Sequence, residues 1–237
     1  MKKLFLLLFT SCSLSATTSI AQLAIAPEIG ISTCSMSIIP PTPYHKLSTG
    51  SITGTEIGGI LDIGISKHLY FQSGLFFSVK GAAKSFGYNS GDTMVENVDQ
   101  KFHIHYLELP VNVIFKINTQ GQGRIFFGLG ASIAYTIGGT NQLHDYGHYP
   151  NSAPFDSSAN VQIQGGRDVS KLDIGLNLMA GYEFNRGLYL RAFYYYGFTD
   201  ISTYGDESAK NLSYGLSVGY FVSKKRHTSL ASELIAE

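Results

Sequence analysis

Residues 103–117, HIHYLELPVNVIFKI, alternate between two kinds of side chain over a length suited to a β-strand. One register holds only large apolar residues: Leu107, Leu109, Val111, Val113 and Phe115. The other register is mixed and contains Pro110. Because successive side chains of a strand point to opposite faces, this strand has one apolar face and one mixed face. Proline cannot donate to a ladder hydrogen bond, so we predict a bulge or a missing ladder bond at Pro110.

The same period of two recurs along most of the chain, and no segment has a convincing helical pattern. Eight segments of this kind cover residues 23–32, 56–65, 69–80, 104–117, 124–137, 171–184, 188–198 and 211–222. A tilted strand needs about 9–11 residues to cross a membrane, and each segment is long enough.

The links between these segments alternate strictly between short and long. The short links are 66–68, 118–123 and 185–187, and the long links are 33–55, 81–102, 138–170 and 199–210. Outer-membrane barrels have short periplasmic turns on one side and longer extracellular loops on the other. The pattern therefore predicts an all-β fold: an eight-stranded antiparallel transmembrane up-and-down β-barrel with four long extracellular loops and both termini in the periplasm.

The two registers differ in charge and in size. The apolar register of the eight segments contains no charged residue, whereas the opposite register contains many glycines and a set of charges: Glu28, Glu56, Asp62, Lys80, Glu108, Lys116, Arg124, Lys171, Asp173, Glu183 and Arg191. Small and paired charged side chains suit the narrow lumen of an eight-stranded barrel. We therefore expect the apolar face to contact outer-membrane lipid, namely lipopolysaccharide and phospholipid. A soluble lipocalin-like ligand-binding barrel is the alternative, and it would reverse the two faces.

The beginning of the chain has the features of a secretory signal peptide. Two lysines precede the apolar residues 4–9, and Ser19 and Ala21 are small residues suited to cleavage before Gln22. The predicted organisation is a signal peptide at 1–21, an outer-membrane β-barrel domain at 22–222 and a periplasmic C-terminal tail at 223–237.

Composition narrows the functional classes. Only 14% of the residues are charged, against about 25% in typical soluble domains, and no basic tract suggests binding of nucleic acid. Of the two cysteines only Cys34 lies beyond the predicted cleavage site, which excludes an internal disulfide and a cysteine metal site in the mature chain.

Several motifs resemble one known family. YLELPVNVIFKI at 106–117 resembles the Tyr-Leu-Glu-(Ile/Leu)-Pro strand of the Bacteroidetes outer-membrane β-barrel family that includes PorT-like proteins. Residues 125–135, 172–184, 187–201 and 212–222 are similar to the strands that follow it in that family. The resemblance implies an eight-stranded outer-membrane barrel and implies little about activity. Its PorT-like branch is tied to type IX secretion, which suggests a secretion-system protein as one partner. The chain departs from the pattern in residues 223–237, which continue past the last strand, and in having no tryptophan.

Five interior charges are the predicted lumen network: Glu108, Arg124, Asp173, Glu183 and Arg191. We expect them to pair and to help close the lumen, because unpaired charges in a narrow interior are costly. A conducting pore would need a wider barrel. The expected role is therefore structural, surface-binding or secretion-associated, with no cofactor.

Loop residues supply the remaining candidate chemistry. Tyr146, Tyr149 and Phe155 in the longest link are the expected anchors of a binding surface for a protein partner. His144 and His148 lie near Asp145, but Gly147 and Pro150 disfavour the helix that would align two histidines four residues apart, so we predict no metal site.

An outer-membrane lipid-modifying hydrolase is the enzymatic alternative. Ser78 and His103 both fall near the predicted outer rim, and such an enzyme needs a nucleophile beside a base. No motif selects these two residues, so we expect no enzymatic activity.

Overall fold

The computed structural model describes residues 23–39, 47–89, 95–121, 123–145, 155–160, 169–202 and 208–222. The predicted signal peptide at 1–21 and the predicted tail at 223–237 lie outside these described residues. Within the described ranges, no helix has both the length and the apolar character needed to cross a membrane.

The described residues form ten strands, eight of them long. The strands are β1 (Leu23–Ile39), β2 (Leu47–Gly50), β3 (Ile52–Gly64), β4 (Leu69–Asn89), β5 (Val95–Thr119), β6 (Gly123–Asp145), β7 (Phe155–Asn160), β8 (Leu172–Phe184), β9 (Leu188–Gly197) and β10 (Ser208–Tyr220).

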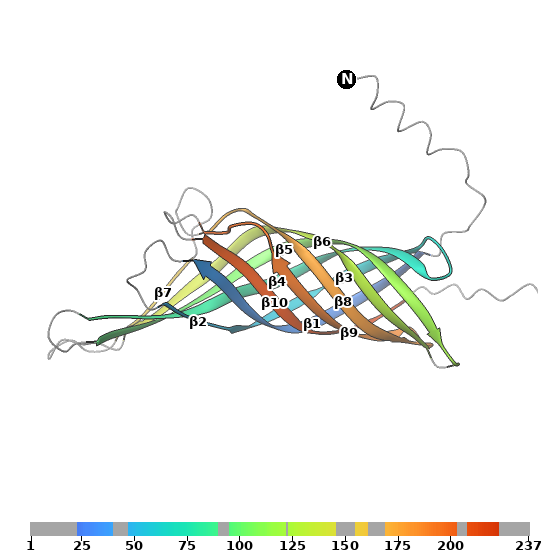
Figure 1. Cartoon of the computed structure of the whole chain (residues 1–237), viewed down its shortest axis with the longest axis horizontal. Coiled ribbons are helices and arrows are strands. Elements are labelled where there is room, and N and C mark those ends of the chain that lie inside the picture. Colours follow the sequence, from blue (N-terminus) through green and yellow to red (C-terminus); the bar gives the residue numbers. More distant parts are fainter. Residues whose placement is uncertain are drawn as a thin grey trace, which may run out of the picture.

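The eight long strands close into one antiparallel ring. Each pairs with its neighbours in the order β1, β3, β4, β5, β6, β8, β9 and β10, and β10 then pairs with β1. The short strands β2 and β7 are attached to β4 and β6 outside this ring. Figure 1 shows the long strands wound steeply around one axis, with β1 beside β10. The predicted eight-stranded antiparallel barrel is confirmed.

The two faces of the ring separate as the alternation predicts. On the outer face, Ile29 is 56% exposed, Phe127 is 52% exposed and Leu216 is 65% exposed. Facing inward and buried are the charged residues Glu28, Asp62, Lys80, Glu108, Lys116, Asp173, Glu183 and Arg191. A lipocalin-like barrel would have these faces reversed. Lys171 is an exception to the prediction, because it lies before β8 and is exposed.

The ring has two different ends, here called the turn end and the loop end. At the turn end, consecutive strands are joined by the short links after Gly64, Thr119 and Phe184. Gly121 and Gly187 have positive φ in these links, which is the conformation that glycine adopts at least cost. The four longer links lie at the loop end, as the order of short and long links predicts.

Three strands extend beyond the rest at the loop end. β4, β5 and β6 have 21, 25 and 23 residues, whereas β9 has 10. Residues 81–89, 95–102 and 138–145 were expected to be loops, and they are strands instead. Together with β2 and β7 they form a five-stranded ribbon, visible at the left of Figure 1, here called the extended sheet (β2, β7 and residues 83–89, 95–101 and 142–145).

The irregularity predicted at Pro110 occurs on one side of β5. Pairing with β4 is interrupted at Leu109 and Pro110, and the register is the same before and after the gap. The Ser73 hydroxyl donates to the Pro110 carbonyl oxygen at 2.9 Å. On the other side, Pro110 pairs regularly with Ser132 of β6. A missing ladder bond is therefore confirmed toward β4. The register shift between β5 and β6 lies elsewhere, opposite His105 and Tyr106, where β6 has the extra residue Ile137.

Candidate functional site: the charged lumen and the extended sheet

The lumen nearest the turn end contains a four-membered ionic cluster. Lys116 Nζ lies 2.5 Å from Asp62 Oδ2 and 3.1 Å from Glu183 Oε2. Arg124 donates to both carboxylate oxygens of Glu183, at 2.6 and 2.8 Å. Arg124 also donates to the Tyr70 hydroxyl at 2.7 Å. The two cations and two carboxylates balance one another, which makes their burial tolerable.

A second cluster lies farther along the lumen and joins β1 to β9. Arg191 donates to Glu28, and the Tyr189 hydroxyl donates to the same carboxylate. Arg191 Nη1 also donates to Gln72 Oε1 at 3.1 Å. Because β10 lies between β1 and β9 in the ring, this cluster links strands that are not hydrogen-bonded neighbours.

The third cluster centres on Glu108 and lies closer to the loop end. Lys80 Nζ is 2.8 Å from Glu108 Oε2, and the hydroxyls of Ser78 and Ser132 donate to Glu108 at 2.9 and 2.5 Å. Lys80 Nζ also lies 3.5 Å from the ring centroid of Tyr195, within the range of a cation–π interaction. Glu108 is thus surrounded by three donors.

Asp173 is held by neutral donors instead of by a direct ion pair. Asn211 Nδ2 donates to Asp173 Oδ2 at 2.8 Å and to the Tyr106 hydroxyl oxygen at 3.0 Å. Asp173, Asn211 and Tyr106 are all almost completely buried. This polar group lies beside the apolar residues of the loop end, including Ile104 and Tyr106 itself.

The structure brings only two of the five predicted network residues into direct contact, Arg124 and Glu183. Glu108, Arg191 and Asp173 belong to separate clusters. Their direct partners are residues outside the predicted set: Lys80, Glu28 and Asn211. The lumen therefore contains a series of clusters along its axis.

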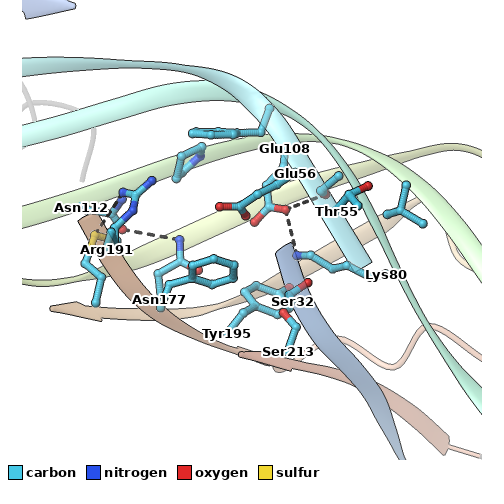
Figure 2. A pocket seen from close by; sticks show the side chains of 16 residues that line it. Ser32, Thr55, Glu56, Lys80, Glu108, Asn112, Asn177, Arg191, Tyr195 and Ser213 are labelled. Carbon is cyan, nitrogen blue, oxygen red and sulfur yellow. Dashed lines mark hydrogen bonds and ion pairs between the residues drawn. The ribbon is translucent and has the colours of Figure 1, made fainter. Parts of the chain in front are cut away.

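A small cavity remains between the second and third clusters. Its volume is about 50 Å³, enough for a few water molecules. Figure 2 shows Glu56 and Glu108 between Arg191 on one side and Lys80 on the other. Glu56 interacts electrostatically with both cations. Buried apolar side chains pack around the clusters toward each end of the lumen, with Phe126 and Tyr189 on the turn side and Ile104 on the loop side.

Inward-facing glycines make room for these side chains. A Cβ atom on Gly219 would lie 2.2 Å from the Tyr189 hydroxyl oxygen, and one on Gly30 would lie 2.7 Å from Glu56 Cγ. Neither contact is sterically allowed. The concentration of glycine in the interior register is therefore a consequence of large side chains crossing a narrow lumen.

The residues considered for a hydrolase are not brought together. Ser78 faces the lumen and donates to Glu108, whereas His103 lies in the outward register of β5. Among the described residues, no group of three or more His, Cys, Asp or Glu side chains is placed to hold a metal ion. His144 pairs with Asp156 of β7, and His148 lies outside the described residues.

The predicted loop anchors fall mostly outside the described part of the chain. Tyr146 and Tyr149 are outside it, and Phe155 is described only as the first backbone position of β7. The described part of this region instead contains a surface groove of about 510 Å³ on the extended sheet. Its lining is polar apart from Leu143: Asp99, Lys101, Gln142, Leu143, His144, Asp156, Ser157 and Ser158.

Sequence reasoning missed two kinds of interior residue. Tyrosines such as Tyr189 and Tyr195 cross the lumen and bond or cover its charges. The predicted network also left out Lys80, the partner of Glu108, and Glu28, the partner of Arg191, although both stand in the interior register. A signal for the tyrosines does exist, because residues 189, 191, 193 and 195 alternate with the lipid-facing residues of the same strand.

Comparison with known proteins supports the architecture. The model of the outer membrane protein beta-barrel domain family matches residues 15–203. No curated protein matches the chain.

The chain is also similar to several solved structures of bacterial proteins. Ail, the attachment invasion locus protein of Yersinia pestis, is 14% identical, with 85% of this chain and 98% of that chain covered and a TM-score of 0.36. OprG of Pseudomonas aeruginosa is 13% identical, with 85% and 96% covered and a TM-score of 0.40. Neisserial surface protein A is 14% identical, with 82% and 96% covered and a TM-score of 0.35. Because the family model spans most of the chain, this protein belongs to the outer membrane protein β-barrel domain family and is a small integral outer-membrane barrel.

Proposed function

We propose that the chain is a closed membrane barrel that holds a protein-binding sheet beyond the bilayer at the cell surface. The observation that carries this proposal is a change of pattern along the single strand β5. Residues 107–117 present large apolar side chains on the outer face, whereas residues 99–101 are polar in both registers. Polar groups facing hydrocarbon in both registers are costly, so this part of β5 belongs in water.

The length of β5 supports the same division. β5 has 25 residues and β9 has 10, a difference that corresponds to about 50 Å of strand. A membrane crossing needs only about 9–11 tilted residues. The extra residues therefore project from the loop end, which we assign to the cell exterior because short turns face the periplasm in such barrels.

The extended sheet offers two features suited to a protein partner. Its groove contains both signs of charge, with Lys101 near Asp99 and Asp156. Within the described ranges, β7 pairs with β6 alone, so its second edge presents backbone N–H and C=O groups to which another strand can add.

A photo-crosslinking amino acid at Ser158 of the extended sheet tests this function in intact expressing cells. We expect a discrete protein adduct from Ser158 and only lipid adducts from the control position Val111 on the outer face of the barrel. A probe at Lys101, which lines the same groove, should give the same protein adduct, and deleting residues 141–165 should abolish that adduct. The proposal fails if Ser158 and Val111 give the same adducts, or if the deletion leaves every adduct unchanged.

A secretion-associated role is the second candidate. The resemblance of residues 106–117 to the PorT-like strand favours it. Deleting the gene should then lower the amount of exported cargo proteins in the medium of a host that has a type IX system. Unchanged cargo levels would contradict the secretion-associated role and favour the surface-binding role.

The filled lumen supports the proposal that the barrel does not conduct ions. Three ionic clusters and two groups of packed apolar side chains fill the interior, and the cavity between them is about 50 Å³. We expect no steady current through the purified protein in planar bilayers. A large and steady open-state current would refute a closed lumen.

We propose no catalytic role. The hydroxyl of Ser78 donates to the Glu108 carboxylate, and Ser78 lies on the opposite face of the sheet from His103. Mass spectra of lipid A from cells with and without the protein should be identical. An altered acyl pattern would favour a lipid-modifying enzyme instead.

A further inference from the structure

The exposed charge at the turn end of the ring has one sign. The three links at this end contain Lys67 and Arg186, here called the turn-end cations, and no aspartate or glutamate. Both residues are exposed. The acidic residues that lie near this end, Asp62 and Glu183, are buried in the lumen and already pair with cations there. The described surface of the turn end therefore carries positive charge that no exposed carboxylate neutralises.

The turn-end cations are also free of other bonds. Within the described ranges, no hydrogen bond or ion pair joins either side chain to another residue. The loop end differs, because the exposed cations Lys101 and Lys171 are accompanied there by the exposed carboxylates Asp156 and Asp200. The two ends of the barrel thus differ in the charge that they offer to a partner, and the turn end is suited to an anionic one.

Both turn-end cations border the lipid-facing band. Lys67 follows the exposed Ile65, and Arg186 lies between the exposed Phe184 and Leu188. Their links lie on opposite sides of the ring, because β5 and β6 separate them in one direction and β10 and β1 in the other. A long basic side chain in such a position lays its methylene groups on apolar surface and holds its charge in the polar layer. This layer is where lipid phosphates lie.

The sequence beyond the described residues adds to the same charge. Strand β10 ends at the turn end, and the chain continues past Val222 with Lys224, Lys225 and Arg226. The acidic residues of the segment 223–237 come only toward its end. Basic clusters directly beside a membrane attract anionic lipids. The predicted tail therefore starts with three cations next to the turn-end links.

We propose that the turn end binds the headgroups of anionic phospholipids in the adjoining leaflet. The turn-end cations donate to phosphate oxygens, while the acyl chains of the same lipids lie on the apolar band. A headgroup such as glycerol leaves the phosphate charge uncompensated, whereas choline neutralises it within the lipid. A lipid fits better than a protein because the cations border lipid-facing residues on opposite sides of the barrel. This inference does not rest on the surface-binding role, which concerns the loop end.

Electron paramagnetic resonance of spin-labelled lipids tests the preference, with the protein in phosphatidylcholine vesicles. The fraction of motionally restricted label is compared between phosphatidylglycerol and phosphatidylcholine. We expect phosphatidylglycerol to be enriched about twofold, because a preference of about fivefold at each cation is averaged over all boundary lipids. The enrichment should disappear in about 1 M salt, where the screening length is about 3 Å. Equal restriction of the two labels at low salt would overturn the proposal.

Removal of charge locates the preference. The double variant Lys67→Gln/Arg186→Gln should lower the enrichment from about twofold to about 1.5-fold, and Lys67→Arg/Arg186→Lys should retain it. The control Lys101→Gln/Lys171→Gln removes two exposed cations from the loop end and should leave the enrichment unchanged. All these residues are exposed, so each variant should keep the heat-modifiable gel mobility of a folded barrel. An unchanged enrichment in the turn-end variant, or an equal loss in the control, would contradict the proposal.

The contribution of the tail has a separate test. Lys224→Gln/Lys225→Gln/Arg226→Gln should also lower the enrichment, and combining this change with the turn-end double variant should abolish it. An unchanged enrichment in the triple variant would contradict the assignment of the tail to this surface. A phosphatidylglycerol with a diazirine on its headgroup should label residues 65–68 and 185–187 and spare Lys171. Labelling that favours Lys171 would place the anionic lipid at the loop end and overturn the proposal.

Discussion

Two parts of strand β5 have the same backbone conformation and opposite chemistry. In residues 107–117 exposed apolar side chains alternate with buried side chains, three of which are the polar Glu108, Asn112 and Lys116, and the ladder closes into a ring. In residues 99–101 both registers are polar and partly exposed, and the ladder continues into an open ribbon. The backbone hydrogen bonds of a strand are thus compatible with either solvent, and the side chains decide which part lies in lipid.

The comparison also shows where tight packing is needed. Inside the ring, charges are buried and bonded to partners across the lumen, and glycines admit large neighbours. On the extended sheet, the same residue types are exposed to water, which screens their interactions. Matched substitutions in the two parts should therefore differ in effect.

Loss of a lumen cation should give the largest effect. Lys116→Met removes the partner of Asp62 and one partner of Glu183, and it leaves a buried carboxylate without a cation. We expect a loss of about 3–5 kcal/mol in the free energy of unfolding. Urea unfolding in lipid vesicles measures it. Lys101→Met on the extended sheet should leave the free energy of unfolding almost unchanged. Similar losses in both variants would contradict the contrast between the buried lumen and the exposed extended sheet.

A charge on the outer face should come next. Leu109 lies within the outward apolar run of β5 and is 44% exposed. Leu109→Arg should cost about 2–4 kcal/mol if the residue is near the middle of the bilayer. The control Leu143→Arg makes the same change on the extended sheet, and its unfolding free energy should stay close to that of the parent. An equal cost for Leu143→Arg would place the extended sheet in lipid.

Crowding of the lumen should have a smaller effect. Gly219→Ala places a methyl group against the Tyr189 hydroxyl, which must move away from Glu28. We expect a loss of about 1–3 kcal/mol, typical of overpacking. Gly138→Ala, which has no neighbouring heavy atom within 4 Å, is the control and should be neutral. The packing account fails if the two variants have the same melting temperature.

The smallest expected effect concerns Asp200, in the link between β9 and β10. Burial opposes its ionisation, but the amide N–H groups of Ala209 and Ser202 donate to Asp200 Oδ1, and the net result is a lowered pKa. The stability from these bonds is present above the ordinary pKa and is lost as the pH falls through the lowered value. The NMR shift of the Ala209 amide should titrate with a midpoint below 3.8. A midpoint at or above that value would show that the bonds are absent.

The sequence predicts the ring well because lipid imposes a strict requirement on alternate residues. Every outward position in residues 107–117 must be apolar, and this requirement is visible in one strand alone. The extended sheet was predicted as loops because water imposes no such pattern on residues 95–101 and 142–145. Polar strands that are hydrogen-bonded to a neighbour on each side do not need alternating apolar residues, so the sequence does not distinguish them from loops.

The lumen partners could not be predicted for a different reason. Arg191 and Glu28 are on strands that β10 separates, and their contact depends on the stagger of the strands around the ring. The interior register identifies which charges face the lumen. It does not determine which of them meet, because side chains as long as arginine can reach several strands across a narrow interior.

Electron paramagnetic resonance of spin labels along β5 tests the central claim most directly. Single cysteines are placed in turn from residue 99 to residue 117, in a Cys34→Ser background. In lipid vesicles, oxygen accessibility should rise and fall with a period of two from residue 107 to residue 117, highest at Leu109, Val111 and Val113. A water-soluble nickel reagent should instead reach residues 99–101 in both registers. Nickel access at Val111, or a lipid-type alternation that continues through residues 99–101, would contradict the account.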